Sequence, residues 1–109
     1  MTSTCKFGEL FVCRFPFTSG EVSKPRPVLV LFDVGSDAII CRITSVAHQG
    51  PLEIPVAGWR QAGLEKPSTI RLSRLVTAEK SLVTRRIGKL TEADAAAVRT
   101  AWNQHITLL

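Results

Sequence analysis

The feature that most constrains the fold is the run from Val28 to Phe32, five consecutive apolar residues that follow Lys24-Pro25-Arg26-Pro27. Such a run of β-branched and bulky residues predicts a strand buried on both faces, at the centre of a sheet. Each proline fixes its own φ and pushes the residue before it into extended geometry, so the chain enters the strand already straightened. Arg26 is therefore held on stiff backbone, where its planar guanidinium suits a phosphate or carboxylate. A rim arginine packing its stem on the sheet is the plain alternative.

Most of the remaining chain predicts further short strands. We expect them over residues 8–15, 38–44, 52–56, 68–73 and 85–90. The period of two puts Arg42 and Thr44 on one face of their strand, and Arg71 and Ser73 on one face of theirs, opposite two apolar neighbours. Loops are expected over 18–23 and 45–51, one short helical turn within 75–83, and residues 57–67 are too irregular to assign.

The end of the chain predicts a helix. Thr91 suits the N-cap, and Glu92 and Asp94 follow in the first turn, where carboxylates favour a helix start. An apolar stripe then follows at spacings of three and four, formed by Ala95, Val98, Trp102, Ile106 and Leu109. Short strands with one terminal helix indicate a mainly β fold, a small and strongly bent antiparallel sheet or barrel, in a single domain over residues 1–109.

Composition excludes several classes of protein. With 45% hydrophobic and 21% charged residues the chain is expected to be globular, and its longest apolar run of five residues is too short to cross a membrane. No signal-peptide core follows Met1, so a cytoplasmic location without membrane attachment is expected. The three cysteines lack a C-x-x-C pair and the two histidines lack ligand spacing, so we expect no disulfide, metal site or cofactor. Cys13 and Cys41 are expected to be buried thiols.

Positive charge is concentrated in the body of the chain. Residues 1–90 carry thirteen Lys or Arg against seven Asp or Glu, and residues 91–109 carry one against two. A basic body suggests an anionic partner, either nucleic acid or an acidic protein segment. Because aromatic residues make up only 6% of the chain and tyrosine is absent, phosphate contacts are expected to matter more than base stacking.

Arginines and hydroxyls gather at the expected strand ends, namely Arg26, Arg42, Thr44, Arg71 and Ser73. The sequence contains no G-x-S-x-G elbow and no Gly-rich phosphate loop followed by lysine. RNA carries its own nucleophile in the 2′-OH, so a protein that cleaves it needs a base, an acid and cationic donors for the charge that grows on phosphorus. The cluster fits the last requirement, although simple phosphate binding fits the same residues.

Five segments in order resemble the PemK/MazF family of toxin endoribonucleases from bacterial toxin-antitoxin pairs. They are Gly8-Glu9-Leu10 with Phe15-Pro16-Phe17, Lys24 to Val30, Ile43-Thr44-Ser45, Pro67 to Leu72, and Arg86 to Leu90. The resemblance implies a small SH3-like barrel of the CcdB/PemK type with a C-terminal helix, acting as a homodimer. It also implies metal-independent cleavage of single-stranded RNA or mRNA to a cyclic phosphate and a 5′-OH, and a cognate antitoxin as partner.

By this resemblance, Arg26 contacts the scissile phosphate, Thr44 hydrogen-bonds the same group, and Glu21 is a loop carboxylate for proton transfer. Substrate contacts are expected from Lys24, Arg42, Ser45, Arg71, Ser73 and Arg86. One departure matters, because Ser73 stands where some members carry the aspartate of an Arg-x-Asp pair. Serine is a poor general base at neutral pH, so the base is Glu21 or is unassigned.

Two other functions remain open at this point. CcdB gyrase poisons resemble the same fold, but their helix ends in Trp-Gly-Ile, whereas this chain ends His105-Ile106-Thr107-Leu108-Leu109. A catalytically silent RNA- or protein-binding barrel is the second alternative, which the missing aspartate keeps open. The sequence of the RNA that is cut depends on the loops over residues 18–23, 47–51 and 59–67, which the sequence does not place.

Overall fold

The computed structural model describes residues 4–14 and 24–109, which form one antiparallel sheet of six strands and a helix. In chain order the elements are β1 Glu9–Cys13, β2 Arg26–Val34, β3 Asp37–Thr44, β4 Glu53–Pro55, β5 Thr69–Glu79, the 3₁₀ turn η1 Lys80–Leu82, β6 Val83–Lys89 and α1 Glu92–His105. The strand order is β4-β5-β3-β2-β1-β6, so β2 and β3 are central and β4 and β6 are the edges.

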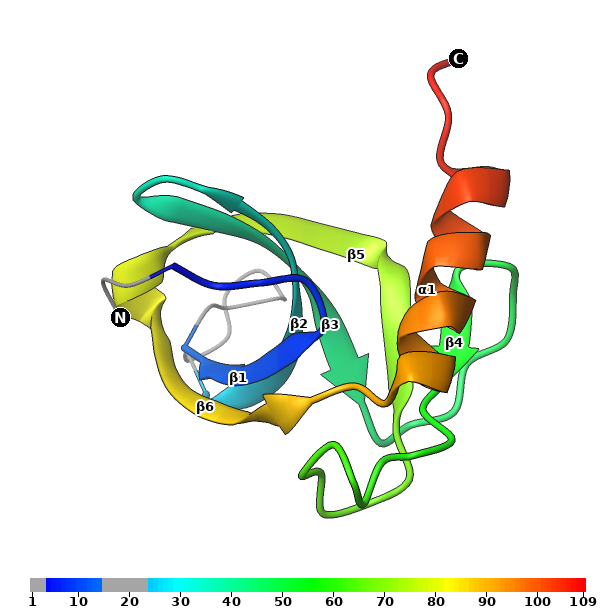
Figure 1. Ribbon diagram of the computed structural model, residues 1–109, viewed down its shortest axis with the longest axis horizontal. Helices are drawn as coiled ribbons and strands as arrows, with labels where there is room; N and C mark the ends of the chain where they lie inside the picture. The colour runs from blue at the N-terminus through cyan, green and yellow to red at the C-terminus, as the bar shows by residue number, and fades with distance from the viewer. Residues whose placement is uncertain (1–3, 15–23) are drawn as a thin grey trace.

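The sheet curls strongly around a common interior, and α1 lies at one side, next to β4 and β5 (Figure 1). This arrangement confirms the expected mainly β fold, a strongly bent antiparallel sheet with a C-terminal helix. No helix among the described residues is long and apolar enough to cross a membrane.

Alternate residues of β2 enter two separate cores. Leu29 and Leu31 pack in a cluster that continues to α1, and Val28 and Val30 pack in a second cluster with β1 and β3. The expected double burial is therefore confirmed for these four residues, as is the burial of Cys13 and Cys41. It was wrong for Phe32, which is 44% exposed, because the register of β2 against β3 shifts between Val30 and Phe32.

Two predicted boundaries were wrong. The strand expected to end at Ser73 continues to Glu79, since Leu75 to Glu79 pair with Cys41 to Asp37 of β3. The one short helical turn expected within 75–83 is confirmed as η1. The last strand begins at Val83, two residues earlier than expected. The pairing of β5 with β3 is irregular between Arg71 and Leu75, so the alternation of buried and exposed residues before this point does not continue in register after it. The first strand ends at Cys13, and Phe15 lies outside the described residues.

The helix begins as expected. The hydroxyl of Thr91 accepts a hydrogen bond from the backbone N–H of Asp94 at 3.2 Å. Ala95, Val98 and Trp102 pack against the first core cluster. The predicted stripe is too long, because α1 ends at His105: Ile106 is the C-cap and Leu109 is fully exposed.

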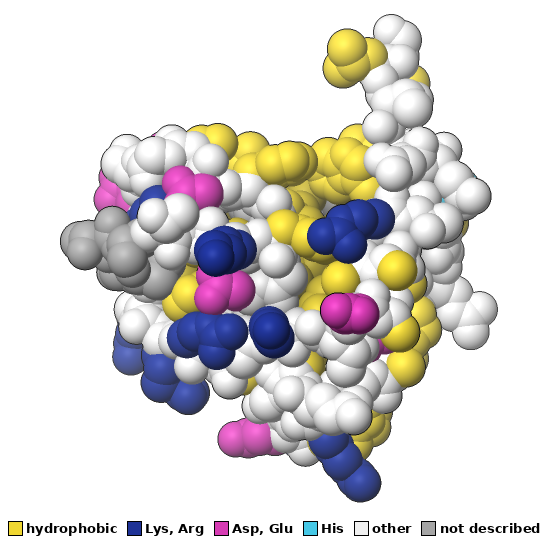
Figure 2. Space-filling view, viewed as in Figure 1, with side chains coloured by type: hydrophobic (Ala, Val, Ile, Leu, Met, Phe, Trp, Pro, Cys, Tyr) yellow, Lys and Arg dark blue, Asp and Glu magenta, His cyan; other side chains and the backbone are white. Residues whose placement is uncertain are grey.

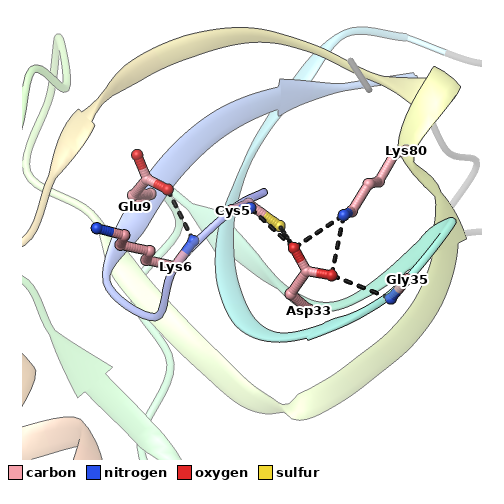
Figure 3. A network of polar contacts seen from close by, with 6 residues as sticks. All are labelled: Cys5, Lys6, Glu9, Asp33, Gly35 and Lys80. Atoms are coloured by element: carbon pink, nitrogen blue, oxygen red, sulfur yellow. Dashed lines mark hydrogen bonds and ion pairs between the residues drawn. The ribbon is translucent and has the colours of Figure 1, made fainter. Parts of the chain in front are cut away.

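A charged pair fastens the β2–β3 hairpin to η1 (Figure 3). Lys80, only 7% exposed, donates to both carboxylate oxygens of Asp33 at 2.8 and 2.9 Å. Asp33 also accepts hydrogen bonds from the backbone N–H groups of Cys5 and Gly35, at 2.9 and 3.0 Å. These hydrogen bonds, that of Lys80 first, hold the pKa of Asp33 well below its usual range. We call these residues the Asp33–Lys80 cluster.

Candidate nucleic-acid site

A hollow of about 500 Å³ opens at the end of the sheet where β2 begins and β3 ends. One wall is formed by residues 25–27, a second by residues 42–46, and a third by residues 63–66 with Ser68. Arg85 and Ile87 of β6 and Val12 of β1 complete the lining. Among the described residues four cations line it, namely Arg26, Arg42, Lys66 and Arg85, and we call it the cationic hollow.

Arg26 and Thr44 lie in this hollow because β2 and β3 are antiparallel neighbours. Val28 pairs with Arg42, so the start of β2 meets the end of β3. Thr44 is only 8% exposed, and its hydroxyl oxygen accepts a hydrogen bond from the N–H of Val46 at 3.1 Å. A hydroxyl offers one donor and two acceptor positions, so this contact leaves its O–H to donate. The hollow thus combines a guanidinium on rigid backbone with a fixed hydroxyl.

The pKa of Arg42 reflects the other positive charges that lie close to it. Burial lowers the pKa of its guanidinium, and the positive charges of Arg26, Arg71 and Arg74 lower it further. An arginine stays protonated near neutral pH even so. An anion that enters the hollow would relieve this repulsion, and phosphate and carboxylate are the groups that arginines bind with paired hydrogen bonds.

Arg71 and Ser73 do not line the hollow. Both contact Glu53, the first residue of β4: Arg71 donates its Nε–H to one carboxylate oxygen, and Ser73 donates its hydroxyl to the other at 3.0 Å. The Glu53 side chain is only 6% exposed. Arg71 lies beside Arg42 across the β3–β5 pair, so this carboxylate balances one of the arginines next to the hollow. This chain lacks the aspartate of the Arg-x-Asp pair, but a carboxylate from another strand, that of Glu53, contacts Arg71.

The other expected site residues divide into three groups. Arg42 and Ser45 line the hollow together with Arg26 and Thr44. Lys24 is exposed outside it, and Arg86 lies at the edge strand, where its Nε donates to Glu9 at 2.8 Å. Glu21 lies outside the described residues. On the face shown in Figure 2, Lys and Arg side chains gather over β1 and β6.

Sequence reasoning missed several residues that belong to this region. Glu53 stands between apolar neighbours in a short strand, and this alternation is the signal that could have placed it on the face of Arg71. Glu65 and Lys66 line the hollow from a segment that gave no periodic pattern. Arg85 of β6 also lines the hollow.

Fold and site together define a class, a small curled β protein with a cationic hollow suited to phosphate. A family model described as PemK-like, MazF-like toxin of type II toxin-antitoxin system matches residues 6–106. The chain is also 30% identical over 76 residues to a protein of Mycolicibacterium smegmatis named probable endoribonuclease MazF, covering 65% of this chain and 70% of that protein. The chain belongs to the PemK/MazF family of type II toxin-antitoxin toxins.

Solved structures with the same fold include members of this family. The Mycobacterium tuberculosis toxin MazF-mt6 matches with a TM-score of 0.73 and 22% identity, over 88% of this chain and 93% of that chain. An endoribonuclease in complex with its cognate antitoxin, from a mycobacterial species, matches with a TM-score of 0.75 and 16% identity, over 93% of each chain. At these identities the likeness shows the fold alone.

Proposed function

We propose that this chain is an RNA-cleaving toxin whose active site is the cationic hollow. As a member of its family it is an endoribonuclease, and its substrate is single-stranded RNA cut by attack of the 2′-OH, without a metal, to a cyclic phosphate and a 5′-OH. The observation that carries the proposal is the position of Arg26 and Thr44 in one hollow with three further cations. The matched relative named as an endoribonuclease supports the reaction class.

In this proposal Arg26 and Thr44 stabilise the charge that develops on the scissile phosphate. The guanidinium fork can donate two hydrogen bonds to phosphate oxygens, and the Thr44 hydroxyl, oriented by the N–H of Val46, donates a third. Because the prolines on either side fix the backbone of Arg26, little conformational freedom is lost when the phosphate binds. Arg42, Lys66 and Arg85 would neutralise the flanking phosphates.

By the family resemblance, the general base is assigned to Glu21. Ser73 donates its hydroxyl to Glu53, and both oxygens of the nearly buried Glu53 already accept hydrogen bonds. Neither group suits proton abstraction from a 2′-OH as it stands. Glu21 precedes Arg26 by five residues, and this assignment rests on the family resemblance. Glu53 has a different part, to hold Arg71 beside Arg42.

The partner of this toxin is a cognate antitoxin, as expected in a type II pair and as in the complex of the mycobacterial relative. We infer that an acidic or amphipathic antitoxin segment competes with RNA for the arginines of the hollow. The expected cytoplasmic location remains part of the proposal.

A homodimer is also part of the proposal, and exposed apolar side chains support it. Phe32 is 44% exposed and packs edge-on against Trp102 with ring centroids 5.4 Å apart, and Leu75 is 42% exposed. Hydrophobic side chains gather in Figure 2 along the upper edge, between the β2–β3 hairpin and α1. Exposed apolar patches of this kind commonly mark protein contacts. Sedimentation of the wild type beside Phe32→Asp tests this, with a monomeric variant expected.

The experiment that tests the activity is incubation of purified protein with mixed-sequence RNA in excess EDTA, followed by mapping of both fragment ends. Cuts at a recurring short sequence with 5′-OH ends, lost in Arg26→Ala and kept in Arg60→Ala, would support the proposal. Arg60 is a matched control because it is exposed, stacks over Trp59 and does not line the hollow. Intact RNA from a folded wild-type protein would favour the silent binding barrel or the gyrase poison instead.

A further inference from the structure

One wall of the cationic hollow, residues 63–66 with Ser68, belongs to a segment over residues 57–68 that hydrogen bonds hold at its start, middle and end. At its start, the backbone N–H groups of Ala57 and Gly58 donate to the carboxylate of Asp94 in α1, at 3.2 and 2.8 Å. In its middle, the N–H groups of residues 62–64 donate to carbonyls of residues 58–60. At its end, Val56 N–H donates to Ser68 O at 2.9 Å, which closes the loop.

Two glycines let this segment lie directly on β6. A Cβ at Gly63, whose φ is +96°, would meet the carbonyl oxygen of Ile87 at 2.7 Å, and a Cβ at Gly88 would collide with the carbonyl of Ala62. Leu64 is anchored in the first core cluster. The residues that follow Leu64 are thus presented to the hollow from a backbone that is already ordered, and in Figure 1 this green loop lies at the lower edge of the molecule.

Glu65 is the only carboxylate among the described residues that line the hollow. Its side chain is exposed, and the described residues make no ion pair with it. A carboxylate repels phosphate, so Glu65 does not serve the backbone of an RNA strand. An ionised carboxylate only accepts hydrogen bonds, and it therefore pairs with donors on the edge of a base.

The four bases differ in what they offer to such a group. On the Watson–Crick edge, guanine presents two adjacent donors, N1–H and the N2 amino group, which match both oxygens of a carboxylate. Cytosine and adenine present one amino group each, beside a ring nitrogen that accepts. Uracil presents a single N–H between two carbonyl oxygens, which repel a carboxylate. Unstacked bases of single-stranded RNA expose this edge to a protein.

We propose that Glu65 is a specificity residue that binds the Watson–Crick edge of a guanine next to the scissile phosphate and rejects uracil. This inference rests on the proposed function, because it assumes that RNA occupies the hollow. Its chemistry is separate from that of Arg26 and Thr44: Glu65 selects the base, and the other two bind the phosphate. Lys66, on the same wall, supplies positive charge to the neighbouring backbone.

The test measures binding of short 2′-fluoro uridine oligonucleotides in which a single guanosine is moved along the chain. Fluorine removes the nucleophile, so binding is read without cleavage. The wild type is expected to bind the best guanosine-containing oligonucleotide about 10- to 100-fold more tightly than the all-uridine one, the usual discrimination of a bidentate base contact. Glu65→Gln should lose most of this difference.

Glu92→Gln is the matched control, because Glu92 is exposed on α1, away from the hollow, and the substitution makes the same change of charge. It should keep the guanosine preference while raising affinity for both RNAs slightly. A wild type that does not prefer guanosine at any position, or a preference that survives Glu65→Gln, overturns the inference. Cleavage of the same oligonucleotide with 2′-OH groups tests the proposed function separately, so each can fail alone.

Discussion

The Asp33–Lys80 cluster and the cationic hollow use charged side chains in opposite ways. In the first, Lys80 donates to both oxygens of Asp33, and two backbone N–H groups complete the coordination of that carboxylate. In the second, Arg26 and Arg85 line one space whose single described carboxylate, Glu65, makes no ion pair with them. The first cluster satisfies its charges within the fold. We propose that the second holds positive charge for a ligand, and this difference then separates a structural polar cluster from a functional one.

The largest effect is expected at Arg26. Arg26→Ala should lower RNA turnover by about 10²- to 10³-fold, the usual cost of removing a donor that stabilises a developing oxyanion. The free energy of unfolding should change by no more than about 0.5 kcal/mol, because Arg26 belongs to neither core cluster. Single-turnover cleavage tests the predicted loss of turnover, and thermal unfolding of the same samples tests the predicted stability. A variant that loses activity and stability together would make Arg26 a structural residue.

Lys80→Met should give the converse result. The substitution leaves Asp33 beside an apolar side chain, so we expect Tm to fall by several degrees while turnover, measured well below Tm, stays near that of the wild type. The double variant Asp33→Asn/Lys80→Met should recover part of the loss, since removing both partners of a charged pair costs less than removing one. If the double variant is no more stable than Lys80→Met, the pair does not explain the loss.

Glu53→Gln should change how the hollow binds an anion, because Glu53 balances one arginine beside the hollow. Without that charge, affinity for a 2′-fluoro RNA should rise about 2- to 5-fold at low salt, and the gain should shrink as salt is added. Turnover should fall, since Arg71 loses its fixed partner. Glu79→Gln, at the exposed end of β5, controls for net charge. Weaker binding by Glu53→Gln would mean that the carboxylate orders the hollow rather than balancing it.

The part of this arrangement that sequence predicts is the part determined by neighbouring residues. Alternation placed Arg42 and Thr44 on one face of β3, and the prolines placed Arg26 at the entrance of β2, and both placements hold in the structure. These are consequences of a period of two within one strand. The capping of α1 by Thr91 is equally local and was predicted for the same reason.

The part that sequence did not predict depends on contacts between distant segments. Glu53 meets Arg71 through the β4–β5 register, which follows a connection without periodic pattern. Glu65 reaches the hollow because Asp94 of α1 and Gly88 of β6 fix the preceding loop. The alternation around Glu53 indicates its face of the strand but not its partner, and no local signal places Glu65 at the hollow. Phe32 was predicted to be buried because it ends an apolar run. That run does not reveal the irregularity in the pairing of β2 with β3 between Val30 and Phe32.

The smallest effect is expected in the pH dependence of stability. Hydrogen bonds from Lys80 and from two backbone N–H groups depress the pKa of folded Asp33 below its unfolded value of 3.8. The group therefore stabilises the fold fully above that pH and loses its contribution as the pH falls through the folded pKa. The difference in Tm between wild type and Asp33→Asn should thus be constant near neutral pH and should shrink progressively below about pH 4. Among the described residues that line the cationic hollow, no carboxylate forms an ion pair of this kind, so Arg26→Ala should keep the same difference from wild type across the range. A difference for Asp33→Asn that grows on acidification would mean that Lys80 does not stabilise the ionised carboxylate.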